Sequence, residues 1–202
     1  MVITGVWYAL ALALAGVVTG YLTKVTWLGV PFYILAVFCL WFFRDPDRVI
    51  PDGPVAVSPA DGKVVSISRD PDGRTRLCIF LNVFDVHVNR SPIAGTIVKR
   101  TYRQGKFLVA SRDEASSQNE QNTFVVEGDG VSVEFSQIAG LIARRILWYK
   151  DTGDKVDKGE RVGLIKFGSR VDLLFNADWK LTVTLGERVS AGSSIIARRV
   201  KS

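Results

Sequence analysis

The first 43 residues are almost entirely apolar and contain one charged position. Two apolar stretches, residues 2–22 and 25–43, each approach the ~20 residues with which a helix crosses a bilayer. Lys24, the charged residue, stands between them. Its charge would cost on the order of 3 kcal/mol at the centre of one long membrane helix, but little at a turn near the interface. The pattern therefore predicts a membrane-embedded helical hairpin over residues 1–43.

A shallow re-entrant hairpin is the alternative to a spanning one, because Pro31 and several glycines weaken the helices. A cleaved signal peptide fits poorly, since the first residues carry no positive side chain and no small-residue cleavage site precedes a polar mature start. Arg44 and Arg48 follow the second stretch directly, and positive residues mark the cytoplasmic side of membrane helices. We therefore expect residues 44–202 to lie on the cytoplasmic side of the cell membrane.

Residues 44–202 have a different pattern, in which short runs of Val, Ile, Thr and Phe are bounded by Gly, Pro, Asp and Asn. Such runs lie at residues 62–68, 76–83, 123–126, 131–138 and 180–185. This pattern is typical of short strands joined by turns, so we predict a mainly-β domain. The segment 105–122 is polar with few apolar residues, which favours a mobile loop or lid.

Two segments resemble the halves of a biotinyl/lipoyl-type barrel, namely residues 59–65 and 153–163. In those barrels the pattern Gly-Asp-x-Val-x-x-Gly-Glu, found here at residues 153–160, makes a turn between strands. Carrier proteins with this fold place a modified lysine at a hairpin tip between the halves, and this chain has no such lysine. We therefore expect a barrel-sandwich catalytic domain that follows the hydrophobic hairpin and lacks the carrier function.

The formal net charge is +6, which favours an anionic partner. A nucleic acid is not expected, because no basic run is interleaved with aromatic residues and no nucleic-acid-binding motif is present. An anionic membrane surface fits better, since each nearby Lys or Arg contributes about 1 kcal/mol there. The two cysteines, Cys39 and Cys78, lie far apart, and together with a single histidine they offer no ligand set for a metal.

The only histidine, His87, lies in a segment that alternates apolar and polar residues. If this segment is a strand, Asp85, His87 and Asn89 share one face and predict a polar cleft. Because an imidazole exchanges protons near neutral pH, His87 suits general-base work, and an ordinary hydrogen-bonded or surface histidine is the alternative. Asp61 is the candidate to orient it as in a catalytic triad, although Asp-Gly is also a turn signal.

The step from Gly168 to Ser169 lies late in the β-rich region. Glycine has no Cβ to block a strained approach, so the Ser169 hydroxyl can attack the carbonyl carbon of Gly168. Self-cleavage at this bond would turn the serine into a pyruvoyl group, a new electrophile. Alone the signal is weak, because Gly-Ser pairs are common in loops and Ser169 is not in the Gly-x-Ser-x-Gly elbow of hydrolases.

The co-occurrence of these segments is more specific than any one of them. The chain carries Phe-Arg-Asp-Pro at residues 43–46, Ser-Pro-Ala-Asp-Gly at 58–62, Asp-Val-His-Val-Asn-Arg-Ser-Pro at 85–92 and Phe-Gly-Ser-Arg at 167–170. In this order and spacing they resemble the phosphatidylserine decarboxylase family in its short membrane-bound form, which includes archaeal-type enzymes acting on archaetidylserine. The resemblance covers residues 40–202.

The resemblance implies a proenzyme that cuts itself into residues 1–168 and 169–202, with the first residue of the smaller fragment converted to the pyruvoyl group. His87 and Asp61 match the family's histidine and aspartate, which assist the serine by general-base catalysis. The pyruvoyl carbonyl then forms a Schiff base with the amine of a serine phospholipid and accepts the electrons freed when carbon dioxide leaves. The product is an ethanolamine phospholipid.

The expected partners are the serine phospholipid, the membrane lipids around it and the chain's own two fragments, and assembly into a homo-oligomer stays open. One alternative function is the same chemistry on archaetidylserine. Another is a membrane hydrolase that uses Ser169, His87 and Asp61 without self-cleavage, and a third is a non-catalytic anchored barrel.

Longer family members carry a second histidine three residues before the position of His87, and Phe84 stands there in this chain. The proton donor after loss of carbon dioxide is therefore expected to be His87 or a water.

Four arginines are candidates for binding the substrate. Arg170 suits a carboxylate or phosphate, and Arg90 follows the histidine segment directly. Arg144 and Arg145 lie among apolar residues of the segment 137–149, a mix that suits a phosphate beside lipid tails. Solvated arginines on ordinary strands are the alternative.

Overall fold

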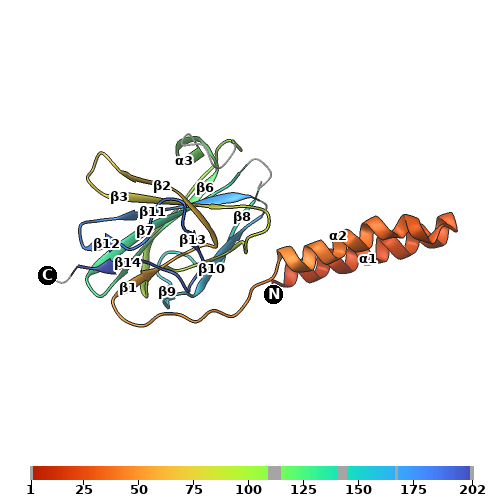
Figure 1. The fold of residues 1–202 in the computed structure, drawn as a ribbon, viewed down its shortest axis with the longest axis horizontal. Coiled ribbons are helices and arrows are strands. Elements are labelled where there is room, and N and C mark those ends of the chain that lie inside the picture. The colour runs from red at the N-terminus through yellow and green to blue at the C-terminus, as the bar shows by residue number, and fades with distance from the viewer. Residues whose placement is uncertain (1, 109–114, 141–144, 167, 201–202) are drawn as a thin grey trace. The chain divides into compact units, whose positions relative to one another are not determined.

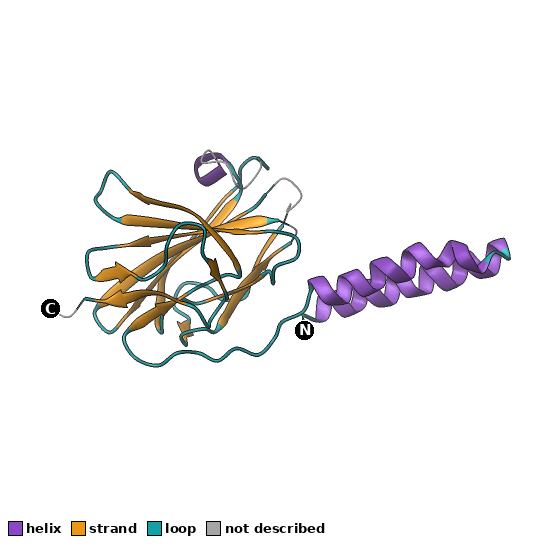
Figure 2. Ribbon diagram, in the orientation of Figure 1, coloured by secondary structure: helices purple, strands orange, loops and turns teal. Residues whose placement is uncertain are grey.

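The computed structural model describes residues 2–108, 115–140, 145–166 and 168–200. The chain forms two compact units, Met1–Asp47 and Arg48–Ser202, which are treated separately below (Figure 1). The first unit contains helices and the second is built largely of strands (Figure 2).

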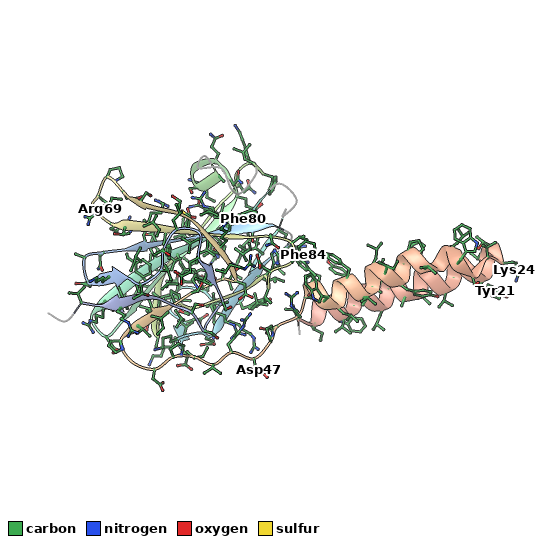
Figure 3. All side chains as sticks on the ribbon, in the orientation of Figure 1. Tyr21, Lys24, Asp47, Arg69, Phe80 and Phe84 are labelled. Carbon is green, nitrogen blue, oxygen red and sulfur yellow. The ribbon has the colours of Figure 1, made fainter. Side chains whose placement is uncertain are left out.

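The first unit is a pair of helices that run in opposite directions. α1 (Ile3–Thr23) and α2 (Val30–Phe42) lie side by side and are joined through the 3-10 helix η1 (Thr26–Gly29). α1 is long and apolar enough to cross a membrane, whereas α2 is shorter. Lys24 follows α1 with a φ of 57°, and its Nζ lies 4.4 Å from the centre of the Tyr21 ring at the turn of the hairpin (Figure 3). The predicted helical hairpin is confirmed, with the charged residue at its turn.

Small residues allow the two helices to approach closely. A Cβ on Gly29 would lie 2.7 Å from the carbonyl oxygen of Gly16, so a larger residue there would push the helices apart. Pro31, expected to weaken the second stretch, occupies the first turn of α2, where its missing N–H leaves no hydrogen bond unmade. It therefore favours the start of α2 and does not break the helix.

The second unit is mainly β, as predicted, and all its strand pairs are antiparallel among the residues described. The largest sheet has the order β13-β2-β3-β11-β7-β6-β5-β9, and two smaller sheets have the orders β1-β14-β12 and β4-β10-β8 (Figure 1). The strands are β1 (Val55–Val57), β2 (Gly62–Arg69), β3 (Thr75–Leu81), β4 (Val88–Arg90), β5 (Gly95–Arg103), β6 (Gln121–Gly128), β7 (Val131–Ile138), β8 (Ile146–Trp148), β9 (Lys155–Val156), β10 (Arg161–Ile165), β11 (Ser169–Phe175), β12 (Trp179–Leu181), β13 (Arg188–Val189) and β14 (Ile195–Arg199). The predicted fold class, a β domain after an apolar helical hairpin, is confirmed.

Strand β11 lies inside the large sheet, between β3 and β7. All seven of its residues are buried. The side chains that it contributes to the hydrophobic core are Val171, Leu173 and Phe175. Arg170 and Asp172 point to the opposite face, because side chains alternate along a strand. Ser169 is the first residue of β11 and lies opposite Leu81 of β3, so the strand fixes this serine toward the interior of the unit.

The polar segment 105–122 is only partly a loop. It contains the short helix α3 (Ala115–Gln118), and its last two residues begin β6. The Asn119 side chain holds part of this segment in place, because its Nδ2 donates to the carbonyl oxygens of Leu108 at 2.9 Å and Ala139 at 2.8 Å. Residues 109–114 lie outside the described part of the chain.

A series of buried amides crosses the second unit. Arg100 Nη1 donates to Asn122 Oδ1 at 3.3 Å, and Asn122 Nδ2 donates to Gln137 Oε1 at 2.9 Å. Gln137 Nε2 donates to Asn89 Oδ1 at 2.9 Å, and Asn89 Nδ2 donates to the carbonyl oxygen of Pro59 at 3.5 Å. The three amide side chains are fully buried. Each amide accepts on its oxygen and donates from its nitrogen, so the series ties β4 to the large sheet without leaving these groups unsatisfied.

Replacing the central amide tests this series. Gln137→Met keeps the side-chain volume but leaves Asn89 Oδ1 and Asn122 Nδ2 without their partners, and each buried unsatisfied group costs about 1–3 kcal/mol. We expect the melting temperature of the purified full chain to fall by about 4 °C or more. Gln121→Met is the matched control, because Gln121 bonds to Arg103 nearer the surface, and its melting temperature should change by less than half as much. Equal shifts for the two variants would contradict a special role for the buried series.

Candidate active site

The candidate nucleophile, Ser169, is buried at the start of β11. Within the described part of the chain its Oγ has no hydrogen-bond partner. A buried hydroxyl in this state costs about 1–3 kcal/mol. Such groups are rare in folded proteins, and one in a possible nucleophile indicates a site where stability is given up for chemistry.

Gly168, directly before the serine, has a φ of 63°. This is the left-handed region, which glycine adopts readily and other residues adopt only at a cost. A Cβ added here would meet nothing within 4 Å, so backbone conformation and not lack of space favours glycine at this position. The Gly168 N–H donates to Nε2 of His87 at 3.1 Å. The residue before it, Phe167, lies outside the described part of the chain.

His87 is fully buried and has a defined tautomer. An amide N–H can only donate, so Nε2 must be unprotonated where it meets Gly168. The ring proton of the neutral imidazole is therefore on Nδ1, which donates to the carbonyl oxygen of Asp85 at 2.9 Å. The carbonyl oxygen of His87 itself accepts from the Ile165 N–H at 3.2 Å, which fixes the residue against β10. The structure therefore presents an unprotonated Nε2 to the Gly-Ser step.

The condition that the histidine segment is a strand does not hold for residues 82–87. These residues form a turn, and β4 begins only at Val88. Two side chains stabilise the turn, because Asn82 Oδ1 accepts from the Phe84 N–H at 2.7 Å and Asp85 Oδ2 accepts from the Asn82 N–H at 2.9 Å. The turn leaves Phe84 exposed, as Figure 3 shows, and directs the Asp85 carbonyl to His87. Asp85, His87 and Asn89 are all buried, but Asp85 and His87 precede β4 and Asn89 lies within it, so the three do not share the face of one strand.

Asp61 lies in a different set of contacts from the one expected. Arg48 Nη2 donates to both of its carboxylate oxygens at 2.9 Å, and the Ala191 N–H donates to Oδ1 at 2.7 Å. The Nδ1 side of His87, where the aspartate of a triad would bind, faces the Asp85 carbonyl instead. Asp61 thus connects the start of the second unit to the segment near its C-terminal end.

The candidate arginines differ in exposure and in their bonding partners. Arg90 is 6% exposed and donates to the Gly159 carbonyl at 3.0 Å, and Arg170 is 2% exposed and forms a two-point ion pair with Asp172. Both guanidinium groups therefore have structural partners. Arg145 is exposed, and Arg144 lies outside the described part of the chain.

The structure adds residues that the sequence analysis missed. Arg188 of β13 forms an ion pair with Asp85 beside His87, and Ser116 of α3 bonds to Asp172. The signal for Asp172 is visible in the sequence, because Arg170 and Asp172 alternate with apolar residues on one strand and must share a face. No such signal exists for Ser116 or Arg188, whose partners are distant along the chain.

The geometry as a whole suits an intramolecular acyl shift. An unprotonated imidazole nitrogen contacts the peptide just before the serine, whose hydroxyl is buried and next to a carbonyl that it can attack. In the uncut chain Ser169 is buried, which favours attack on the adjacent carbonyl over attack on an external ester or amide.

Comparison with known proteins points to one family. Residues 35–197 match the family model described as phosphatidylserine decarboxylase. A protein of Solibacter usitatus named phosphatidylserine decarboxylase proenzyme is 62% identical over 200 residues, which cover 99% of this chain and 97% of that protein. Proteins of the same name from Nitratidesulfovibrio vulgaris and Aromatoleum aromaticum are 49% and 46% identical, over 85% and 94% of this chain and 82% and 90% of theirs. With a match along nearly its whole length and the serine, glycine and histidine brought together, this chain belongs to the phosphatidylserine decarboxylase family.

Proposed function

We propose that this chain is a proenzyme that cuts itself between Gly168 and Ser169 and then decarboxylates a serine phospholipid to an ethanolamine phospholipid. The observation that carries the proposal is the hydrogen bond from the Gly168 N–H to His87 Nε2, beside a buried serine hydroxyl. The names of the relatives support it, because each is called a phosphatidylserine decarboxylase proenzyme.

Self-cleavage begins with attack of Ser169 Oγ on the carbonyl carbon of Gly168. His87 Nε2 gives up its bond to the Gly168 N–H and takes the hydroxyl proton, which it then passes to the departing nitrogen of residue 169. The peptide bond breaks, and an ester joins the Gly168 carboxyl to the serine side chain. The buried Ser169 hydroxyl without a hydrogen-bond partner raises the energy of the uncut chain, which favours this step.

Breakage of the ester completes the cut. A base removes the Cα proton of residue 169, the bond from Cβ to the ester oxygen breaks, and residue 168 leaves as a carboxylate. The remaining enamine becomes an imine, and water replaces its nitrogen, so ammonia is released and a pyruvoyl group begins the fragment 169–202. That group supplies a carbonyl that captures the substrate amine and accepts the electron pair left by carbon dioxide.

The residues around position 169 fit this group. The position is buried in the uncut chain, and His87, which accepts from the adjacent Gly168 N–H, can hold or deliver a proton there. We assign Asp61 a positioning role, because its bonds to Arg48 and Ala191 join residues from both future fragments. Arg145 is the best placed of the described candidate arginines for the lipid phosphate, since it is exposed and its carbonyl accepts from the Lys166 N–H at 3.3 Å.

We assign this chemistry to a membrane because of the apolar hairpin. α1 meets the length and composition of a membrane span, and we assign the second unit to the cytoplasmic side from the arginines that follow the hairpin. The substrate is a serine phospholipid in that membrane. Assays on diacyl phosphatidylserine and on its ether-linked isoprenoid counterpart would determine which tails the enzyme accepts.

Removing the nucleophile tests the cut. Ser169→Ala has no hydroxyl to form the ester, so we expect one intact chain of about 22.3 kDa and no decarboxylation, whereas the unchanged sequence should give two fragments. Intact mass spectrometry of the purified protein measures this directly, with Ser132→Ala as a matched control that should be cut normally. The proposal would be contradicted if the wild-type protein stayed uncut and still decarboxylated phosphatidylserine.

Replacing the base tests its role. Glutamine at position 87 can still accept a hydrogen bond from Gly168 but cannot take a proton, so His87→Gln should slow self-cleavage by about 100-fold or more. The rate is followed by the fraction of cut chain over time at neutral pH on denaturing gels, with circular dichroism to confirm the β fold. Cleavage of His87→Gln at the normal rate would remove the histidine from this step.

A further inference from the structure

The face of β11 opposite its core residues carries a buried ion pair directly beside the proposed cleavage site. Arg170 Nε lies 2.5 Å from Asp172 Oδ1, and Nη2 lies 3.0 Å from Oδ2, so the guanidinium and the carboxylate meet at two points. Both residues are 2% exposed. A two-point pair of this kind fixes the direction of both side chains and not only their separation.

The Ser116 hydroxyl bonds to both members of this ion pair. It donates to Asp172 Oδ2 at 2.6 Å and accepts from Arg170 Nη2 at 2.5 Å, so its proton and one lone pair are both used. Ser116 lies in α3, and Asn119, the residue after α3, donates to the carbonyl oxygen of Ala139, just past the end of β7. The segment that carries Ser116 is therefore itself attached beside β11.

Two further groups of the large sheet complete the surroundings. Arg170 Nη2 lies 3.0 Å from Cys78 Sγ, and burial raises the pKa of this thiol to about 12, so it stays neutral beside the ion pair. Arg76 Nη1 lies 3.4 Å from Asp172 Oδ2. The Nε and Nη2 atoms of Arg76 donate to the Asp70 carboxylate. The carboxylate of Asp172 thus receives groups from β3, β11 and α3.

The cut changes what this cluster does. Before cleavage, residue 169 is held from both sides along the chain. After cleavage, it is a free chain end, and chain ends fray unless they are attached. Arg170 and Asp172 then belong to the fragment 169–202, whereas Ser116, Cys78 and Arg76 belong to the fragment 1–168. The cluster therefore attaches the new end to the larger fragment one residue away from the reacting group.

We propose that Ser116 and Asp172 are positioning residues for decarboxylation, which hold Arg170 so that residue 169 stays beside His87 after the cut. This inference rests on the proposed function. Arg170 then acts through its attachment to the larger fragment, in place of the substrate contact expected from the sequence. The cluster serves the step that follows cleavage, so its loss should lower kcat and leave the cut itself complete.

The first test is Ser116→Ala, which removes the bridging hydroxyl and keeps the Arg170–Asp172 pair. We expect full cleavage, a kcat about 10-fold lower and an unchanged KM for phosphatidylserine in mixed micelles with a non-ionic detergent, because a small misplacement of a reacting group slows the reaction strongly. Ser116→Thr keeps the hydroxyl and should restore kcat. Ser132→Ala, a serine-to-alanine change on β7 away from this cluster, should leave kcat and cleavage unchanged.

A second variant separates positioning from substrate binding. Arg170→Lys keeps the charge but loses the two-point pair, and it should also be cut fully with a lower kcat and an unchanged KM. A raised KM with normal kcat would show that Arg170 contacts the substrate and would overturn the inference. Failure of Ser116→Ala to cut, or a normal kcat once cut, would overturn it as well. If the unchanged sequence neither cuts nor decarboxylates, the proposed function fails first, which distinguishes the two outcomes.

Discussion

The hydrogen bond between the Gly168 N–H and His87 Nε2 is the contact on which the rest of the site depends. It joins the residue before β11 to the residue before β4, although these lie 81 positions apart in the chain. Because the amide can only donate, the bond also determines the protonation of the ring and requires an acceptor on its far side. The turn at residues 82–87 provides that acceptor through the Asp85 carbonyl. Main-chain groups thus contact both ring nitrogens of His87.

The sequence contains the local parts of this site but not their pairing. Apolar runs and turn residues are enough to predict the hairpin and the mainly-β unit, and the Gly-Ser step and the single histidine are visible as candidates. The partners of Asp61 could not be predicted, because Arg48 and Ala191 meet it only through the folding of distant segments. The turn before β4 was missed because Asn82 and Asp85 bond to the backbone in a segment whose alternation is typical of a strand.

Buried polar groups are concentrated on both faces of β11. On one side, the amide nitrogens of Asn122, Gln137 and Asn89 each donate to the next group of the series, which ends at the Pro59 carbonyl. On the other side, Arg170 and Asp172 meet Ser116 of α3. Nearly all of these atoms have partners, and the Ser169 hydroxyl is an exception among the residues described. If Ser169 is the nucleophile, as proposed, its unpartnered hydroxyl among satisfied polar groups suits a reaction that happens once in each molecule.

The position of β11 within the large sheet has a consequence for the mature protein. Its neighbours on both sides, β3 and β7, precede the proposed cut, and β13 and β14 also pair with strands that precede it. Separating the pieces would require opening four strand pairings and exposing core side chains to water. Dilution should therefore not dissociate them, and the severed molecule should melt in one cooperative transition, as an uncut domain does.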